Sequence, residues 1–270
     1  LRLSGEFPLP VFREAVSIAR ESGARVYAVV NRIMDNGLAA ELPDYLHELG
    51  KIKPDAIVFG DPAVVMAMRQ IGLAIPLHWN GEMTVTNHAA ARFWGGKGAV
   101  RAVLARELNL EQITAFRQNV GMEVEVQVHG ATVIYHSRRH LVESYLEHHG
   151  LESGETGPSR GLYAVEQERP DLLHPVFEDE DGTHIMSADD ICLLDLVPDL
   201  VEAGVDSFRI EGLLKSPEYN ETAIRAYRAA VDRYVASPDD YVPEPEWLES
   251  IRRLQDPRRE LSYGFMFKEQ

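Results

Sequence analysis

The sequence predicts an α/β protein built around parallel strands. Short runs rich in apolar and β-branched residues alternate with segments whose apolar residues recur at helical spacing. Because helices of roughly 10 to 15 residues separate the strands, right-handed crossovers between parallel strands are expected. Six such strands fit a TIM-like (β/α) barrel that lacks two of its usual eight units. An open doubly wound sheet is the alternative. However, none of the expected strands is followed by the GxGxxG pattern of dinucleotide-binding folds.

Each expected strand follows an amphipathic segment that ends near glycine or proline. The first helix ends at Gly23 and is followed by the β-branched run RVYAVVN. The same unit then repeats along the chain. The strands are expected at 25–31, 55–61, 75–83, 101–107, 123–130 and 207–212. The helices are expected at 11–23, 41–54, 62–72, 86–98, 109–121, 190–204 and 221–235.

The repeating pattern is interrupted between residues 137 and 185. This insertion is polar, contains glycine and proline, and is long for a loop of a simple barrel, so either a functional loop or a solvated excursion is expected. After residue 236, a Pro-rich acidic linker leads into a basic tail with an aromatic end. The predicted organisation is a barrel domain, 1–236, that includes the insertion 137–185, with a linker and tail, 237–270, packed on it.

Composition and charge restrict the classes of function. The formal net charge is −16, so the average surface repels nucleic acids and anionic membranes, and a polyanion would need a local basic patch. Cys192, in the expected helix 190–204, is the single cysteine. It excludes an intrachain disulfide and a cysteine-ligated cluster held by this chain alone, and it favours a reducing, cytoplasmic setting. No apolar run predicts a membrane span or a signal peptide. The chain begins at Leu1, and we expect that its natural beginning is missing.

Polar or charged residues stand where the expected strands end, and in a (β/α) barrel these positions surround the active site. The predicted pocket contains Asn31, Asp61, Asn80, Glu82, Arg106, Glu107, His129, Arg209 and Glu211. The candidate catalytic residues, chosen because a carboxylate or imidazole in a partly dry pocket can act as a general base, are Glu82, Glu107, His129 and Glu211. Asn80, Arg106 and Arg209 are candidate binding residues, since an arginine fork suits a carboxylate or phosphate. The alternatives are structural salt bridges and ordinary turn formation.

The stretch HGATVIYHSRRH, residues 129–140, begins at the end of the fifth expected strand and contains three histidines and two arginines. His136 and His140 are four residues apart and would share one face of a helix, but the HExxH pattern is absent and the guanidinium groups oppose a dication. No metal site is therefore expected. The predicted basic turn, which would contact an acidic ligand or RNA phosphate, consists of Tyr135, Arg138 and Arg139. A GxSxG elbow and a P-loop are also absent.

The phrases VLARELNLEQI, VEVQVHG and DSFRIEG, in this order, resemble the U32 peptidase (collagenase-like) family. The similarity covers most of residues 1–236. It implies a TIM-like barrel that begins with two further βα units, which agrees with a chain that starts late. It also implies hydroxylation of a tRNA wobble uridine with prephenate, a dicarboxylate that suits a pocket with arginines.

Two other functions stay open. The family name implies a peptidase, in which Glu82, Glu107 and His129 would assist an activated water. The third hypothesis is a scaffold that binds the ligand without catalysing a reaction.

The chain departs from its hydroxylating relatives at their cysteines. The resemblance places Val133 and His140 where two cysteines are expected, and Thr156 and Ser159 near the other two positions. We therefore expect neither an iron–sulfur cluster nor a metal in this chain. It resembles cysteine-poor members that accompany a cysteine-bearing relative, so that relative is the expected partner. tRNA is expected to bind through the complex, no membrane partner is expected, and a homo-oligomer stays open.

Overall fold

The computed structural model describes residues 7–81, 86–151, 154 and 156–268. The chain divides into two compact units. Unit 1 comprises the described residues up to Leu108 together with Gln112–Glu125, and unit 2 comprises Asn109–Glu111 and the described residues from Val126 onward. The predicted boundary after residue 236 lies inside unit 2 and stays a prediction.

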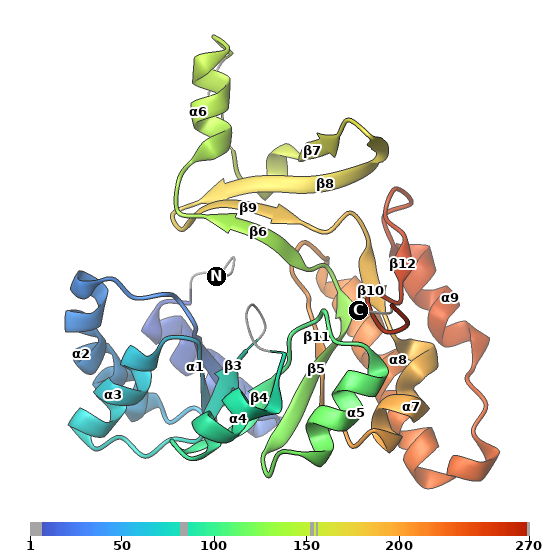
Figure 1. Ribbon diagram of the computed structural model, residues 1–270, viewed down its shortest axis with the longest axis horizontal. Helices are drawn as coiled ribbons and strands as arrows, with labels where there is room; N and C mark the ends of the chain where they lie inside the picture. Colours follow the sequence, from blue (N-terminus) through green and yellow to red (C-terminus); the bar gives the residue numbers. More distant parts are fainter. Residues whose placement is uncertain (1–6, 82–85, 152–153, 155, 269–270) are drawn as a thin grey trace. The chain divides into compact units, whose positions relative to one another are not determined.

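Unit 1 contains a parallel sheet in which β1 pairs with β2, β2 with β3, β3 with β4, and β4 with the start of β5. Its strands are β1 (Tyr27–Val30), β2 (Ala56–Phe59), β3 (Leu77–Asn80), β4 (Ala99–Val103) and the first residues of β5 (Glu123–Gly130). The helices along this part of the chain are α1 (Leu9–Glu21), α2 (Asn36–Ile52), α3 (Pro62–Ile71), α4 (His88–Gly95) and α5 (Leu110–Gln118). Figure 1 shows these helices alternating with the strands, so the predicted α/β class and parallel sheet are confirmed.

Aspartate side chains cap two helices of unit 1. Asp35 accepts a hydrogen bond from the Leu38 N–H at 3.0 Å and thereby caps α2. Asp61 accepts from the Ala63 N–H at 2.8 Å and also from Met34 N–H at 2.9 Å, so it caps α3 and holds the preceding loop. Asp61 thus has the structural role that was the alternative to a pocket residue.

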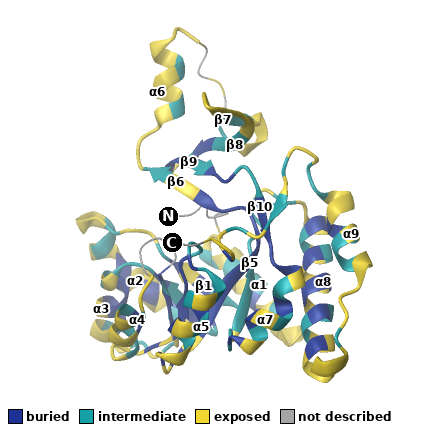
Figure 2. Ribbon diagram, turned by 45° about the vertical axis from the view of Figure 1, so that its right-hand side comes forward, coloured by how far each residue is buried: buried dark blue, intermediate teal, exposed yellow. Residues whose placement is uncertain are grey.

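The main sheet of unit 2 contains the second part of β5. β10 (Asp190–Cys192) runs antiparallel to β5, β12 (Leu261–Ser262) runs parallel to β10, and β11 (Ser207–Ile210) also pairs with β5. The helices of this part are α7 (Val197–Glu202), α8 (Pro217–Ala236) and α9 (Pro245–Leu254), with short 3-10 turns η2 (Leu194–Leu196) and η3 (Pro238–Asp240). Helix α8 buries one face, which includes Tyr219 and Tyr227, and Figure 2 shows this face in dark blue.

The insertion is a second sheet of unit 2. The order is β6-β9-β8-β7, and all neighbours are antiparallel. The elements are β6 (Val133–Ser137), α6 (Leu141–His148), η1 (Pro158–Arg160), β7 (Leu162–Glu166), β8 (Arg169–Asp179) and β9 (Gly182–Met186). Phe177 and Met186 are fully buried in it, whereas α6 has no buried residue (Figure 2). The described residues of the insertion therefore include a sheet with a buried apolar side, and a functional role of the insertion stays a prediction.

Two local predictions were wrong. Residues 190–192 form strand β10, not the start of a helix, so Cys192 ends a strand and is buried beside β5. His136 lies in β6 and His140 precedes α6, so the two histidines do not share a helix face. The first error concerns a short apolar run, in which periodicity cannot separate strand from helix.

Two further points concern closure of the sheet and membrane-spanning helices. The parallel strands of the described residues are established, whereas closure into a barrel stays a prediction. Within the described part of the chain, no helix combines the length and the apolarity that a bilayer span needs.

Candidate functional site

The predicted site residues of unit 1 follow β3 and β4. Asn80 is the last residue of β3 and is half-buried, and Glu82 lies outside the described residues. Arg106 and Glu107 occupy the turn after β4, with Arg106 Nε 3.9 Å from Glu107 Oε1. The Arg106 side chain is buried and the Glu107 side chain is half-exposed. A salt bridge between these neighbours was the structural alternative to a catalytic role.

In unit 2, the backbone brings His129 and Glu211 together. The Glu211 N–H donates to the His129 carbonyl oxygen at 2.9 Å. Next to His129, Gly130 has φ +95°, and a Cβ atom there would lie 2.1 Å from the Glu211 carbonyl oxygen. Arg209 is nearby in sequence, and its Nη2 donates to Gln127 Oε1 at 3.1 Å. Because a Cβ atom at position 130 would collide with Glu211, glycine is needed for this close approach of β5 to the end of β11.

The predicted basic turn lies at the edge of the insertion sheet. Tyr135 is on β6 and is half-exposed, and Arg138 and Arg139 follow the strand. The Arg139 carbonyl oxygen accepts from Thr183 Oγ1 at 2.7 Å, which fixes the turn against β9. Arg138 and Arg139 are exposed, and their proposed contact with an acidic ligand or with RNA stays a prediction.

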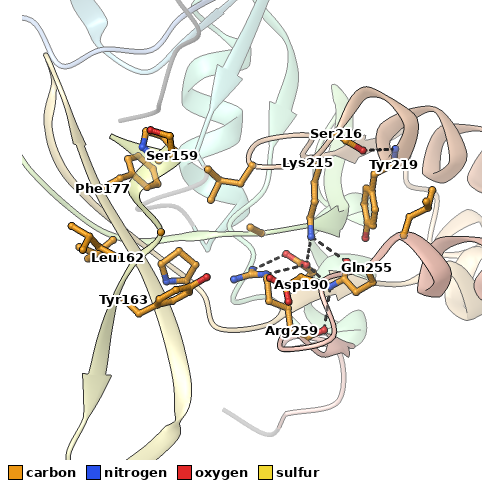
Figure 3. Close-up of a pocket in the computed structure, with 18 residues that line it drawn as sticks. Ser159, Leu162, Tyr163, Phe177, Asp190, Lys215, Ser216, Tyr219, Gln255 and Arg259 are labelled. Atoms are coloured by element: carbon orange, nitrogen blue, oxygen red, sulfur yellow. Dashed lines mark hydrogen bonds and ion pairs between the residues drawn. The ribbon is translucent and has the colours of Figure 1, made fainter. Parts of the chain in front are cut away.

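A cavity of about 570 Å³ lies within unit 2. Its volume is within the range of about 300 to 1,000 Å³ that is usual for small-molecule sites. Figure 3 shows Ser159, Leu162, Tyr163 and Phe177 on one side of it, and Lys215, Ser216 and Tyr219 on the other. None of the predicted site residues that the structure describes lines this cavity. The lining residues used below are Leu162, Val176, Asp190, Leu214, Lys215, Ser216, Tyr219, Leu254, Gln255, Asp256 and Arg259.

Asp190 is the centre of the polar side of the cavity. Its Oδ2 accepts from Lys215 Nζ at 2.5 Å, from Gln255 Nε2 at 2.6 Å and from Arg259 Nε at 3.2 Å. Its Oδ1 accepts from Arg259 Nη2 at 2.7 Å. Arg259 also donates to the carbonyl oxygens of Ser187 and Asp189, both at 3.0 Å. These bonds tie β10 to the loop before α8 and to the segment after α9 (Figure 3).

This network fixes the charge of Asp190. Burial by itself raises the pKa of the carboxyl group, but the hydrogen bond from Arg259 and the charges of Lys215 and Arg259 outweigh burial and lower the pKa to about 2. The carboxylate is therefore ionised at neutral pH, and donors occupy both of its oxygens. It is unsuited to act as a general base or to ligate a metal ion, and no set of three metal-ligating side chains occurs among the described residues.

A buried histidine stands behind the cavity. His129 is fully buried, and its Nε2 lies 2.9 Å from the Tyr219 hydroxyl. On the other side, Tyr227 Oη donates to the Val128 carbonyl oxygen at 2.7 Å and lies 3.5 Å from His129 Nδ1. Because the Tyr227 proton is used at Val128, we assign the imidazole proton to Nδ1. Nε2 then accepts the proton of the Tyr219 hydroxyl.

The same pair is held in its neutral form. Burial lowers the pKa of His129 to about 4, with Lys215 acting in the same direction and Asp190 against it. Burial and the charge of Asp190 raise the pKa of Tyr219. Both shifts oppose transfer of the tyrosine proton to the histidine. His129 is therefore better suited to position Tyr219 at the cavity than to act as a base there.

The sequence reasoning identified His129 but missed the cavity network. One signal was present: Lys215 directly precedes Ser216 and Pro217, a helix-start pattern, and Ser216 Oγ accepts from the Tyr219 N–H at 3.1 Å. That pattern places Lys215 between the end of β11 and the start of α8. Nothing in a single sequence links Asp190 to Gln255 and Arg259, which are 65 and 69 residues away.

Comparison with known proteins identifies the family. The sequence model of the family described as "Peptidase family U32" matches residues 1–270, so the chain belongs to this family. A protein of Bacillus subtilis called tRNA hydroxylation protein P2 is 44% identical over 272 residues, which cover 100% of this chain and 88% of the relative. The tRNA hydroxylation protein P1 of the same organism is 30% identical over 246 residues, which cover 91% of this chain and 58% of that protein.

The family also includes proteins with other names. A collagenase of Porphyromonas gingivalis is 26% identical over 262 residues, covering 93% of this chain and 62% of the relative. A solved U32 peptidase structure aligns with 56% of this chain and 66% of its own, at 19% identity and a TM-score of 0.42. The family resemblance expected from the sequence is confirmed, and the names of its members divide between tRNA hydroxylation and proteolysis.

Proposed function

We propose that this chain takes part in the hydroxylation of tRNA at the wobble uridine, as one component beside a cysteine-bearing U32 relative. The observation that carries the proposal is the 44% identity to tRNA hydroxylation protein P2 over the whole chain. The occurrence of P1 and P2 in one organism supports a second family member as the partner. Association with a further copy of this chain stays a prediction.

The need for a cysteine-bearing partner follows from the residues at the expected cluster positions. Val133 is a buried aliphatic residue of β6 and offers no ligand atom. The ring Nε2 of His140 lies 3.0 Å from the Asp179 carbonyl oxygen, and Cys192 lies on β10. These residues do not fit a cysteine-ligated iron–sulfur cluster. A cluster that serves the reaction would therefore have to be bound by the relative.

Three finer features belong to the same proposal. Prephenate is the proposed co-reactant, and the residues predicted for it are those at the strand ends and the basic turn. A TIM-like barrel is the proposed complete architecture. The proposed site of action is the cytoplasm, where tRNA is found and where a lone cysteine stays reduced.

The cavity gives little support to the peptidase alternative. Hydrolysis of a peptide bond needs an activated nucleophile or water. Ser216 is used as a helix cap, and the described residues that line the cavity include no histidine or cysteine. Asp190 is surrounded by donors and cannot readily take a proton.

Nucleoside mass spectrometry can test the proposal in Bacillus subtilis. A strain lacking P1 and P2 would receive P1 alone, this chain alone, or both. We expect 5-hydroxyuridine-derived nucleosides to be highest when P1 and this chain are expressed together. Equal levels with P1 alone and with P1 plus this chain would contradict a contribution of this chain. Co-purification of the two proteins tests the partnership, and two proteins that elute separately at micromolar concentration would contradict it.

A further inference from the structure

We infer that the cavity of unit 2 binds a small organic acid through a single carboxylate group. Three features of the cavity support this ligand: an excess of one buried positive charge, N–H groups without an acceptor, and exposed apolar side chains on the wall. The ligand class is therefore a singly charged acid with an apolar body. This ligand is independent of the proposed function, because neither tRNA nor a second protein takes part in its recognition.

The charges at the cavity wall leave an excess of one positive charge. The described residues that line the cavity include four charged side chains: Asp190, Lys215, Asp256 and Arg259. Asp256 is paired with Arg258, which lies outside the lining, and their Oδ2 and Nη2 atoms are 2.9 Å apart. Lys215 and Arg259 both bind Asp190, so these two cations share one ionised carboxylate.

The excess charge lies on side chains that solvent reaches poorly. The side chains of Lys215 and Arg259 are 8% and 10% exposed. A buried charge without a full counterion is costly, and an anion that enters the cavity lowers this cost. A carboxylate supplies one negative charge and matches the excess, whereas a phosphate monoester carries about −1.5 to −2 at neutral pH and exceeds it.

Each of the two cations also retains one N–H group that no oxygen of the described residues accepts. Lys215 Nζ has three N–H groups, of which one donates to Asp190 Oδ2 and one to Gln255 Oε1 at 3.1 Å. Arg259 has five, of which two donate to Asp190 and two to backbone carbonyl oxygens. Because hydrogen bonds between charged partners are the stronger ones, a carboxylate gains more from these donors than a neutral oxygen does.

Apolar side chains form another part of the wall. Leu214 and Leu254 line the cavity and are 42% and 37% exposed. Leu162 and Val176 also line it, and Figure 3 shows Leu162 on the side opposite to Lys215. Leu214 has a left-handed backbone with φ +61°, a strained conformation for a bulky residue and one that recurs where ligands are held. Since Leu214 directly precedes Lys215, one strained segment supplies both an apolar and a charged contact.

A titration with matched small molecules tests this ligand class. The protein is the full chain, and the probes are phenylacetate and phenylacetamide, which differ in the charge of one group. Nuclear magnetic resonance of the labelled protein follows both titrations. We expect phenylacetate to bind with a Kd of about 5 mM or tighter, and at least about tenfold more tightly than phenylacetamide. Equal affinity for the two probes, or no saturable binding of phenylacetate up to about 50 mM, would overturn the inference.

Charge variants locate the carboxylate of the probe. Lys215→Met removes the excess charge and leaves Arg259 paired with Asp190, so phenylacetate should bind at least about tenfold more weakly. Lys51→Met removes an exposed lysine that is paired with Glu48, and it should leave the affinity unchanged. Unaltered binding in Lys215→Met, or an equal loss in both variants, would overturn the inference.

A further variant separates binding from damage to the fold. Leu214→Gly removes the apolar contact but relieves the backbone strain, so the thermal midpoint should stay the same or rise. We expect both probes to bind roughly threefold or more weakly, because each loses the same apolar contact. The preference for phenylacetate over phenylacetamide should be retained, since Lys215 is unaltered. Unchanged affinity for both probes in Leu214→Gly would overturn the placement of the apolar body.

Doubly charged probes test the match to a single carboxylate. Phenyl phosphate presents a ring with about two negative charges, and prephenate carries two carboxylates. Neither should bind more tightly than phenylacetate. Binding of either probe about tenfold more tightly than phenylacetate, with loss of that binding in Lys215→Met, would overturn the inference. No RNA and no relative is used, so failure of these titrations rejects only the cavity ligand, whereas failure of the cellular nucleoside test rejects only the proposed function.

Discussion

Gly130 determines how closely two segments of unit 2 approach. Its φ of +95° is unfavourable for residues with a side chain, and an added Cβ would collide with the Glu211 carbonyl oxygen at 2.1 Å. We expect Gly130→Ala to lower the free energy of unfolding by more than about 3 kcal/mol, measured by urea denaturation. Gly98→Ala is the matched control, because Gly98 has φ +104° but no atom within 4 Å of an added Cβ. The control should cost about 1 to 2 kcal/mol. Similar losses in both variants would show that backbone strain, without the clash, explains the effect.

His129 should make stability depend on pH. The folded protein binds a proton at His129 only near pH 4, whereas an unfolded histidine binds one near pH 6.5. Between these values the unfolded state holds more protons, so stability falls as pH falls, by about 3 kcal/mol in total for this residue. His78 acts in the same direction, because burial lowers its pKa to about 4.

Urea denaturation between pH 6.5 and pH 5 can measure this dependence. We expect the free energy of unfolding to fall less steeply with decreasing pH in His129→Gln than in the unaltered protein. The difference in slope should correspond to at most about one bound proton. His148→Gln, at the exposed end of α6, should retain the full decrease. Parallel curves for His129→Gln and the unaltered protein would contradict the assignment of a neutral buried imidazole.

At the residue scale, the sequence identified polar strand ends but not their surroundings. His129 and Glu211 were predicted from their positions after β-branched runs, and the structure brings them together. Tyr219 and Tyr227, which enclose His129, come from a helix about 90 residues later, at a separation that no local pattern records. Burial and pKa depend on these distant partners, so they could not be predicted from the strand itself.

At the element scale, Asp190 connects three segments of unit 2: strand β10, the loop that leads into α8, and the segment between α9 and β12. Its removal should leave the buried cations Lys215 and Arg259 without their counterion. We expect Asp190→Asn to lower the free energy of unfolding by about 3 kcal/mol at pH 7. Asp256→Asn breaks an exposed pair with Arg258 and should cost less than about 1 kcal/mol. Thermal unfolding of both variants provides the measurement, and equal midpoints would contradict a central role of Asp190.

The elements that were predicted well are those whose local pattern agrees with their final environment. β5 was expected at 123–130 and has those bounds, because its valines alternate regularly through a buried strand. β10 was missed because it has only three residues and precedes a helix-like apolar run. Its identity depends on pairing with β5 and β12, which are separated from it by about 60 to 70 residues. Pairing of this kind is a tertiary effect, and local propensity does not specify it.

At the scale of the whole molecule, net charge limits direct contact with RNA. The chain has 43 acidic and 27 basic residues, so its average charge repels the phosphates of RNA. Several arginines of the C-terminal segment are also paired internally: Arg252 with Glu249, Arg253 with Glu246 and Arg258 with Asp256. A phosphate would have to compete with these carboxylates. The partner is therefore the better source of phosphate contacts.

This division of roles predicts how tRNA affinity depends on the partner and on salt. We expect the chain alone to bind tRNA with a Kd no tighter than about 10 µM at 0.15 M salt, within the range of non-specific binding. Addition of the cysteine-bearing relative should tighten binding at least tenfold and steepen its salt dependence, because the added phosphate contacts release counterions. Fluorescence anisotropy with labelled tRNA at several salt concentrations measures both quantities. Submicromolar binding by the chain alone, with a steep dependence on salt, would instead locate a phosphate-binding surface on this acidic chain and would remove the need for a partner in RNA recognition.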